Sequence, residues 1–378
     1  MSLSFDYNLL CQQFHLAQQS PHQYEQPLLS RLTEILESNL YDKLEGGVFS
    51  HGKLGRFKSL LINAQFVVLY SRVANVYSEA SFAQAAIQTS RFFLSSNQSS
   101  FFDRYDYQDP DFHLFSIEEL RHSLDSAQWA AIQCFFCLPE MGVIDTSRLQ
   151  VHRARADIHL HTELHPKQVP LALDAALQLL AMIKQQRAQP AWGVEENDAA
   201  SLQFCKALLT AGKYLNQPDI AQSGQQLLDI LTAKPSLEVE PEYYLDVLLL
   251  SLQYQWRSSD FEQLQKLIDA LKTKTQIKLQ DSANHQDLYH LGRAFNFNTL
   301  ERNFSEVPLL GSIIIEGPEF EARHWLQNAD NQYQEKFRYY AYPIAGATET
   351  RAKLYSNDNA ELVFDSLDSL INHCQDYA

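Results

Sequence analysis

Two kinds of predicted helix alternate along the chain, and this alternation restricts the fold more than any other feature. Residues 60–77 and 243–256 are apolar nearly all round, which is typical of helices buried on every side. Residues 82–94 and 222–231 are amphipathic, as expected of helices with one face in water. A buried helix followed by a half-exposed one is the order that two concentric helical rings require. We therefore predict a mostly α fold, an (α/α)6-type toroid or barrel of helical hairpins.

A paired glycine precedes the first of these buried helices. The chain has only 12 glycines in 378 residues, and Gly46 and Gly47 are adjacent. Glycine permits a positive φ and a close approach of the backbone. The pair therefore predicts a sharp bend ahead of residues 60–77.

One apolar stripe ends on a charge. Leu173, Leu177, Leu180 and Lys184 follow the spacing i, i+4, i+7 and i+11, which predicts a single helix face with a polar end.

The pattern changes near the C-terminus. Residues 312–318 form a β-rich run closed by turn residues, and further helix and strand signals follow at 319–331, 338–344, 352–355 and 366–374. We predict two domains, a toroid over 1–310 and a small α/β cap over 311–378, with weak periodicity at 278–310.

The composition argues against several classes of protein. The net charge of −16 and the lack of a basic stripe argue against nucleic acid binding. No run approaches the roughly 18 apolar residues of a membrane span, so no membrane partner is predicted. The N-terminus shows no signal peptide, and an odd set of five cysteines is typical of reduced thiols. The expected location is cytoplasmic.

Two motifs suggest metal or redox chemistry, and both have a simpler interpretation. Cys134 and Cys137 form a C-x-x-C, but at the C-terminal end of a predicted helix, where small core residues are the favoured interpretation. Residues 151–166 alternate polar and apolar positions and carry His159, His161, Glu163 and His165, which predicts a strand or extended loop at the surface. A metal site there is the less favoured alternative, so neither a metal nor a cofactor is predicted.

Four carboxylates are candidates for paired acid–base chemistry on a sugar. They lie in loops or at helix starts, where carboxylates also simply favour the helix dipole. The candidate catalytic residues are Asp106, Glu195, Glu196 and Glu242. The candidate ligand-binding residues are Arg56, Tyr105, Trp192, Asn197 and Tyr243.

Several motifs, in order, resemble those of the thioredoxin-fused family related to spermatogenesis-associated protein 20, whose C-terminal part is similar to the N-acylglucosamine 2-epimerase toroid. Tyr41-Asp42, Gly46-Gly47 and Phe49 resemble its Y-D-x-x-G-G-G-F run. Lys58, Leu60 and Asn63-Ala64-Gln65 resemble the P-H-F-E-K-M-L-Y-D-N-A helix. The resemblance covers about residues 35–378 and implies a six-hairpin toroid with a terminal βαβ element.

The departures from the family pattern concern polar groups of its cavity. The His and Glu of P-H-F-E fall near Gly55-Arg56-Phe57 and are absent, and the second Asp of a D-A-D loop falls at Gln108. The family's thioredoxin domain has no counterpart in this sequence. A chain that keeps bends and loses cavity groups favours a divergent, non-catalytic toroid that binds a sugar-like ligand or a protein partner at its mouth. The alternatives are a carbohydrate-active isomerase or glycosidase, and a scaffold whose centre is filled by aromatic side chains such as Phe57, Phe101 and Tyr105.

Overall fold

The computed structural model describes residues 5–52, 55–96, 104–106, 110–187, 197–233, 244, 247–248, 250–251, 263, 311–318, 321, 324–325, 337–343, 348–356 and 361–375. The chain divides into two compact units, residues 1–224 and 225–378, and each is described by itself. The predicted boundary at residue 310 stays a prediction.

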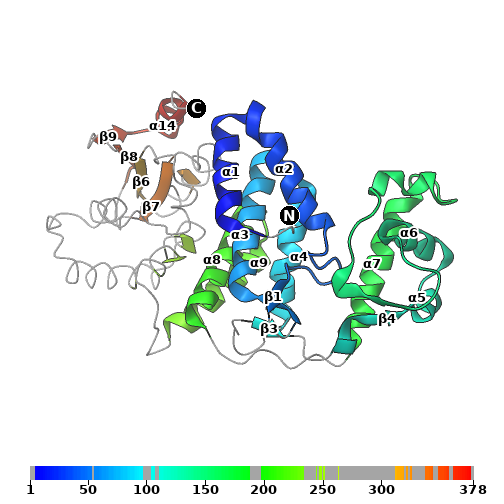
Figure 1. Ribbon diagram of the computed structural model, residues 1–378. Helices are drawn as coiled ribbons and strands as arrows, with labels where there is room; N and C mark the ends of the chain where they lie inside the picture. Colours follow the sequence, from blue (N-terminus) through cyan, green and yellow to red (C-terminus); the bar gives the residue numbers. More distant parts are fainter. Residues whose placement is uncertain are drawn as a thin grey trace. The chain divides into compact units, whose positions relative to one another are not determined.

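Helical hairpins build the first unit (Figure 1). Short turns join the helices of each pair, and side chains such as Ser59 and Asn197 accept hydrogen bonds from the first turn of the helix that follows. The pairs are α1 (Tyr7–Gln19) with α2 (Pro21–Glu37), α3 (Leu60–Tyr77) with α4 (Ala80–Ser96), and α8 (Asp198–Tyr214) with α9 (Pro218–Thr232), of which residues 218–224 belong to this unit.

Helices α3 and α8 form the most shielded part of this unit. They pack against each other, and every residue of α8 from Ala200 to Gly212 is buried. Their partners α4 and α9 expose one face to solvent. The predicted order of a buried helix followed by a half-exposed one is confirmed for α3 with α4, and α9 has the predicted amphipathic character of residues 222–231, whereas most of the other predicted buried helix, 243–256, lies outside the described residues. The mostly helical fold class is confirmed for the described residues.

A second group of helices in the same unit encloses its own apolar core. Phe115, Leu120, Ile132 and Leu173 are among its buried side chains, and Leu44 also belongs to it. Its helices are α5 (Ile117–Ser123), α6 (Ser126–Phe136) and α7 (Gln168–Gln186), with the 3-10 turns η1 (Pro110–His113), η2 (Thr146–Arg148) and η3 (Arg155–Leu160). Strands β4 (Leu114–Ser116) and β5 (Val143–Asp145) pair antiparallel beside them.

A small antiparallel sheet is formed by two strands that precede α3 and one that follows α4. It consists of β1 (Ser50–Gly52), β2 (Gly55–Ser59) and β3 (Arg104–Asp106). The register places Lys58 opposite Tyr105 and Phe57 opposite Asp106.

The second unit contains a four-stranded sheet in the order β7-β6-β8-β9. Strand β6 (Gly311–Gly317) runs parallel to β7 (Phe337–Pro343) and antiparallel to β8 (Arg351–Ser356), and β9 (Glu361–Phe364) leads to α14 (Leu367–Gln375). This sheet with α14 confirms the expected C-terminal α/β element, whereas most of the predicted helix at 319–331 lies outside the described residues. Strand β9 was not predicted, because four residues are too few for a pattern of alternation.

The prediction of a strand or extended loop over residues 151–166 is wrong for its centre. Arg155–Leu160 forms the 3-10 turn η3, in which Ile158 alone is buried. The segment is instead attached to the core around α7 by the buried Ile158, with the partly buried Val151 and Leu164 packed against the same core.

Candidate functional site

The paired glycines form a tight turn, residues 41–49, which we call the glycine turn. The Asp42 amide donates to the Gly47 carbonyl at 2.8 Å, and the Gly46 amide donates to the Asp42 carbonyl at 3.0 Å. Both glycines have positive φ, 84° and 87°, as the sequence predicts. A Cβ on Gly47 would lie 2.8 Å from Asn63 Oδ1, so this position also requires glycine for space.

Side chains of α3 and α4 hold the glycine turn from one side. Asn63 on α3 satisfies both backbone groups of Val48, with Oδ1 accepting at 2.6 Å and Nδ2 donating at 3.0 Å. Thr89 on α4 accepts from the Gly47 amide at 2.9 Å. Two further bonds to α4 are Tyr41 OH to Gln88 Oε1 at 2.9 Å and Gln88 Nε2 to the Leu44 carbonyl at 3.0 Å.

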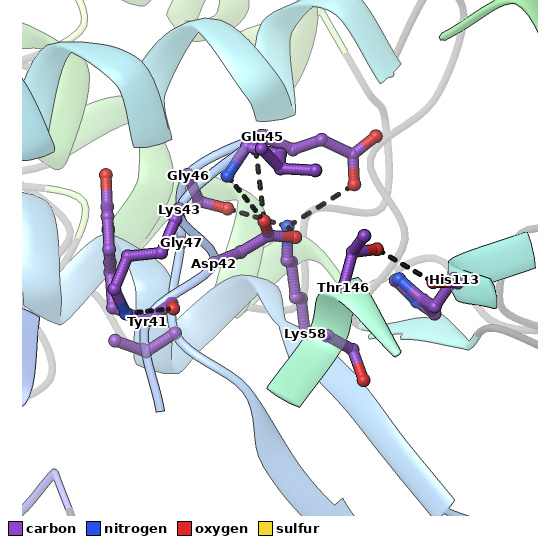
Figure 2. A network of polar contacts seen from close by, with 12 residues as sticks. Tyr41, Asp42, Lys43, Glu45, Gly46, Gly47, Lys58, His113 and Thr146 are labelled. Carbon is purple, nitrogen blue, oxygen red and sulfur yellow. Dashed lines mark hydrogen bonds and ion pairs between the residues drawn. The ribbon is translucent and has the colours of Figure 1, made fainter. Parts of the chain in front are cut away.

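Four charged side chains meet beneath this turn, and we call Asp42, Glu45, Lys58 and Lys184 the charge cluster (Figure 2 shows the first three). Lys58 Nζ lies 2.9 Å from Asp42 Oδ2 and 3.9 Å from Glu45 Oε2. Lys184 Nζ, which arrives from α7, lies 2.7 Å from Glu45 Oε2 and 3.5 Å from Asp42 Oδ2. Each cation therefore faces both anions, and the formal charges cancel.

The cluster is shielded from water. The side chains of Asp42, Lys58 and Lys184 have 0% exposure and that of Glu45 has 5%. Backbone groups complete the coordination, since Asp42 Oδ1 accepts from the amides of Leu44 and Glu45 and Lys58 Nζ donates to the Gly46 carbonyl at 2.6 Å.

Aromatic rings line the cations. Lys58 Nζ lies 3.8 Å from the centre of the Phe92 ring and 5.1 Å from that of Phe49, and Lys184 Nζ lies 5.3 Å from that of Phe112. The buried His113 follows Phe112 in η1 and packs edge-on to Phe49. Its carbonyl accepts from Thr146 Oγ1 at 3.0 Å (Figure 2).

The pKa values follow from burial and mutual attraction. Burial would raise the pKa of Asp42, but the Lys184 and Lys58 ammonium groups outweigh it and hold that pKa well below its usual range. Burial lowers the pKa of Lys58, Asp42 and Glu45 offset only part of this, and the like charge of Lys184 lowers the pKa further. For Lys184, burial also lowers the pKa, but Asp42 and Glu45 reverse the sign and raise it above the ordinary value.

Of the nine predicted site residues, the structure describes the side chain of Asn197, which is not part of this cluster. For Arg56, Tyr105 and Asp106 it describes the backbone alone, and Glu195, Glu196, Trp192, Glu242 and Tyr243 lie outside the described residues. Asn197 is exposed and caps α8, with its side chain accepting from the Ala200 amide at 2.9 Å. These assignments stay predictions.

The cysteine and histidine motifs show ordinary structural roles. Cys134 is half-buried and Cys137 is exposed at the end of α6, so the expectation of a core position is wrong for Cys137. His159 Nδ1 lies 2.6 Å from the Ala156 carbonyl, and His161 Nε2 lies 2.9 Å from Arg153 Nη1. Within the described part of the chain, no group of three or more metal-ligating side chains is close enough to hold a metal.

Sequence reasoning did not identify the cluster as a site. Asp42 and Lys58 entered only through the family motifs, and Lys184 only as the polar end of the α7 stripe. The available signal was that Lys184 continues the stripe of the buried Leu173 and Leu180, which indicates a buried cation in need of an anion.

Comparison with known proteins adds little. The sequence matches no protein-family model, and no curated protein is significantly similar. One solved structure, the crystal structure of D-mannose isomerase, aligns over 72% of this chain and 82% of its own, with 11% identity and a TM-score of 0.25. A likeness this weak carries no argument about fold or activity. None of the described helices combines the length and apolar character that crossing a membrane requires.

Proposed function

We propose that this protein is a non-catalytic helical-hairpin protein that binds a sugar-like ligand or a protein partner, and in which the charge cluster holds the fold. The observation that supports this is the closure of the cluster. The side chains of Asp42, Lys58 and Lys184 have no exposed surface and are paired with one another or with Glu45.

Catalytic carboxylates have to reach a substrate, and paired acid–base chemistry places two of them on either side of one bond. In the cluster, each carboxylate instead contacts two ammonium groups. Protonation of Asp42 at neutral pH is opposed by both lysines, so this carboxyl is unsuited to act as a general acid.

The experiment is a turnover and binding screen on the purified full chain. A panel of aldoses, ketoses, aminosugars and N-acyl aminosugars is followed by NMR for isomerisation and hydrolysis, and the same compounds are tested by thermal shift. We expect no turnover, and we expect any sugar that binds to raise the Tm in a concentration-dependent way. If no sugar binds, a protein partner remains the proposal.

Turnover of any compound would refute the non-catalytic assignment. Loss of that turnover in Asp106→Asn, with an unchanged Tm, would then establish the carbohydrate-active alternative with Asp106 as one of its carboxylates. Asp174→Asn is a suitable control, because Asp174 is exposed and paired with Arg155 on the surface.

A further inference from the structure

The main helix contacts in the described part of the first unit fall into two groups. Helices α1 to α4 and α8 pack together, α6 and α7 pack together with η3, and α5 contributes side chains to the same apolar core as α6 and α7. The glycine turn lies where these groups meet, because Asn63, Gln88 and Thr89 hold it from the first group while Leu44 joins the apolar core of the second.

The two sides of the turn are held by different chemistry. On the side of α3 and α4, the contacts are short hydrogen bonds to backbone groups of Gly47 and Val48, and β2, which carries Lys58, leads directly into α3. On the side of α7 and η1, the turn is held by the ion pairs of Lys184, by the packing of Leu44 and by the edge-on contact of Phe49 with His113.

The ion pairs on the α7 side are the ones that water can most readily replace. Glu45 is the least buried member of the cluster, with 5% side-chain exposure, and Lys184 makes its shortest contact with it. If α7 moves away, Lys58 stays paired with Asp42 at 2.9 Å and faces Glu45 at 3.9 Å, so the carboxylate of Glu45, the most exposed member of the cluster, is the one charge in excess at the turn. The two separated charges, Glu45 and Lys184, gain hydration, which offsets most of the lost attraction.

We propose that the Lys184–Glu45 contact is a latch that opens as a unit, releasing the C-terminal end of α7 and the adjoining η1–β4 segment from the glycine turn while the turn stays held by α3 and α4. This is a conformational device of the fold, and it holds whether the protein binds a sugar or a protein.

Arg187 determines what moves with α7. Its guanidinium pairs with Glu119 at 2.9 Å and donates to the carbonyls of Phe112 and Leu114. It also lies over the Phe115 ring at 3.6 Å. The end of α7 is therefore fastened to η1, β4 and α5, and these should leave the turn together.

Hydrogen–deuterium exchange of the intact chain, read by mass spectrometry, tests the latch. The variant is Glu45→Gln, which keeps the side-chain size and removes the charge that Lys184 contacts most closely. The matched control is Glu140→Gln, since Glu140 forms an exposed ion pair with Arg121. We expect amides of residues 180–187 and 110–116 to exchange at least about tenfold faster in Glu45→Gln, with residues 60–74 and the control variant unchanged.

Two results would overturn the proposal. One is equal acceleration across residues 60–74 and 180–187, which would make the contact a general support of the fold. The other is unchanged exchange at 180–187. If the variant fails to fold, hydrogen–deuterium exchange of the wild-type chain still tests the proposal. The latch requires the amides of residues 180–187 to exchange faster than those of residues 60–74, and equal rates would refute it.

Discussion

Asp42 is the position at which removal of one charge should cost most. Its carboxylate is fully buried, lies 2.9 Å from Lys58 Nζ and 3.5 Å from Lys184 Nζ, and accepts from two backbone amides. In Asp42→Asn, two ammonium groups would share the single Glu45 carboxylate. Removing one partner of a buried pair costs about 3–5 kcal/mol, because the remaining charge is left uncompensated.

That cost corresponds to a large shift in Tm. For a domain of about 150–250 residues, 1 kcal/mol lowers Tm by about 2–4 °C, so we expect Asp42→Asn to lower it by about 6–20 °C. Circular dichroism during heating of the full chain measures this. Asp174→Asn is the control, since its ion pair is exposed and should contribute about 0–1 kcal/mol. A Tm for Asp42→Asn within the range of the control would show that the buried Asp42 carboxylate does not stabilise the fold.

A double variant separates the charge effect from simple loss of contacts. Asp42→Asn with Lys58→Met removes one anion and one cation and leaves the Lys184–Glu45 pair at 2.7 Å. We expect the double variant to be more stable than the sum of the two single losses predicts, because the uncompensated charge is gone. Simple additivity would show that the two residues do not act as a pair.

The stability difference between the wild type and Asp42→Asn should depend on pH. The folded-state pKa of Asp42 is lowered, so its contribution is fully present above the unfolded value of about 3.9 and is lost as pH falls toward the folded value. The stability difference between wild type and Asp42→Asn should therefore be constant above about pH 5 and shrink on acidification. A difference that grows toward low pH would contradict the assignment.

Three further predictions follow from single residues. Gly47→Ala should lower the free energy of unfolding, measured with denaturant, by about 2–4 kcal/mol, because the new Cβ would sit at a positive φ and lie 2.8 Å from Asn63 Oδ1. Gly142→Ala should lower it by only about 1 kcal/mol, because no atom lies within 4 Å of the new Cβ. Burial raises the pKa of the Cys11 thiol to about 12, so a thiol reagent at neutral pH should modify the exposed Cys137 and leave Cys11 unmodified until the chain unfolds. Asn197→Ala should lower the free energy of unfolding by about 1 kcal/mol, because the side chain that caps α8 is lost. An unchanged or increased free energy of unfolding would show that Asn197 does not stabilise α8.

The sequence was sufficient for features that depend on local pattern. The all-round apolar residues 60–77 form α3, and the paired glycines form a turn with positive φ at both positions. Both can be predicted from nearby residues, because the spacing of apolar residues indicates which faces of a helix are buried, and a positive φ is adopted chiefly by glycine.

The candidate site could not be predicted because it depends on distant contacts. Lys184 lies 142 positions from Asp42 in the sequence, and the residues around each of them do not indicate that the two are in contact. The carboxylates selected from the sequence were chosen for their place at loops and helix starts. The buried cluster instead joins a turn, a strand and the end of a helix, and only the fold brings these together.

Amine labelling of the native chain measures whether the charge cluster is closed to solvent. Acetylation with a water-soluble reagent, followed by peptide mass spectrometry, compares Lys58 with the exposed Lys167 at the start of α7. We predict that Lys167 is modified rapidly while Lys58 stays unmodified until denaturant unfolds the chain. Modification of Lys58 at a rate close to that of Lys167 in the native protein would show instead that the charge cluster is open to solvent.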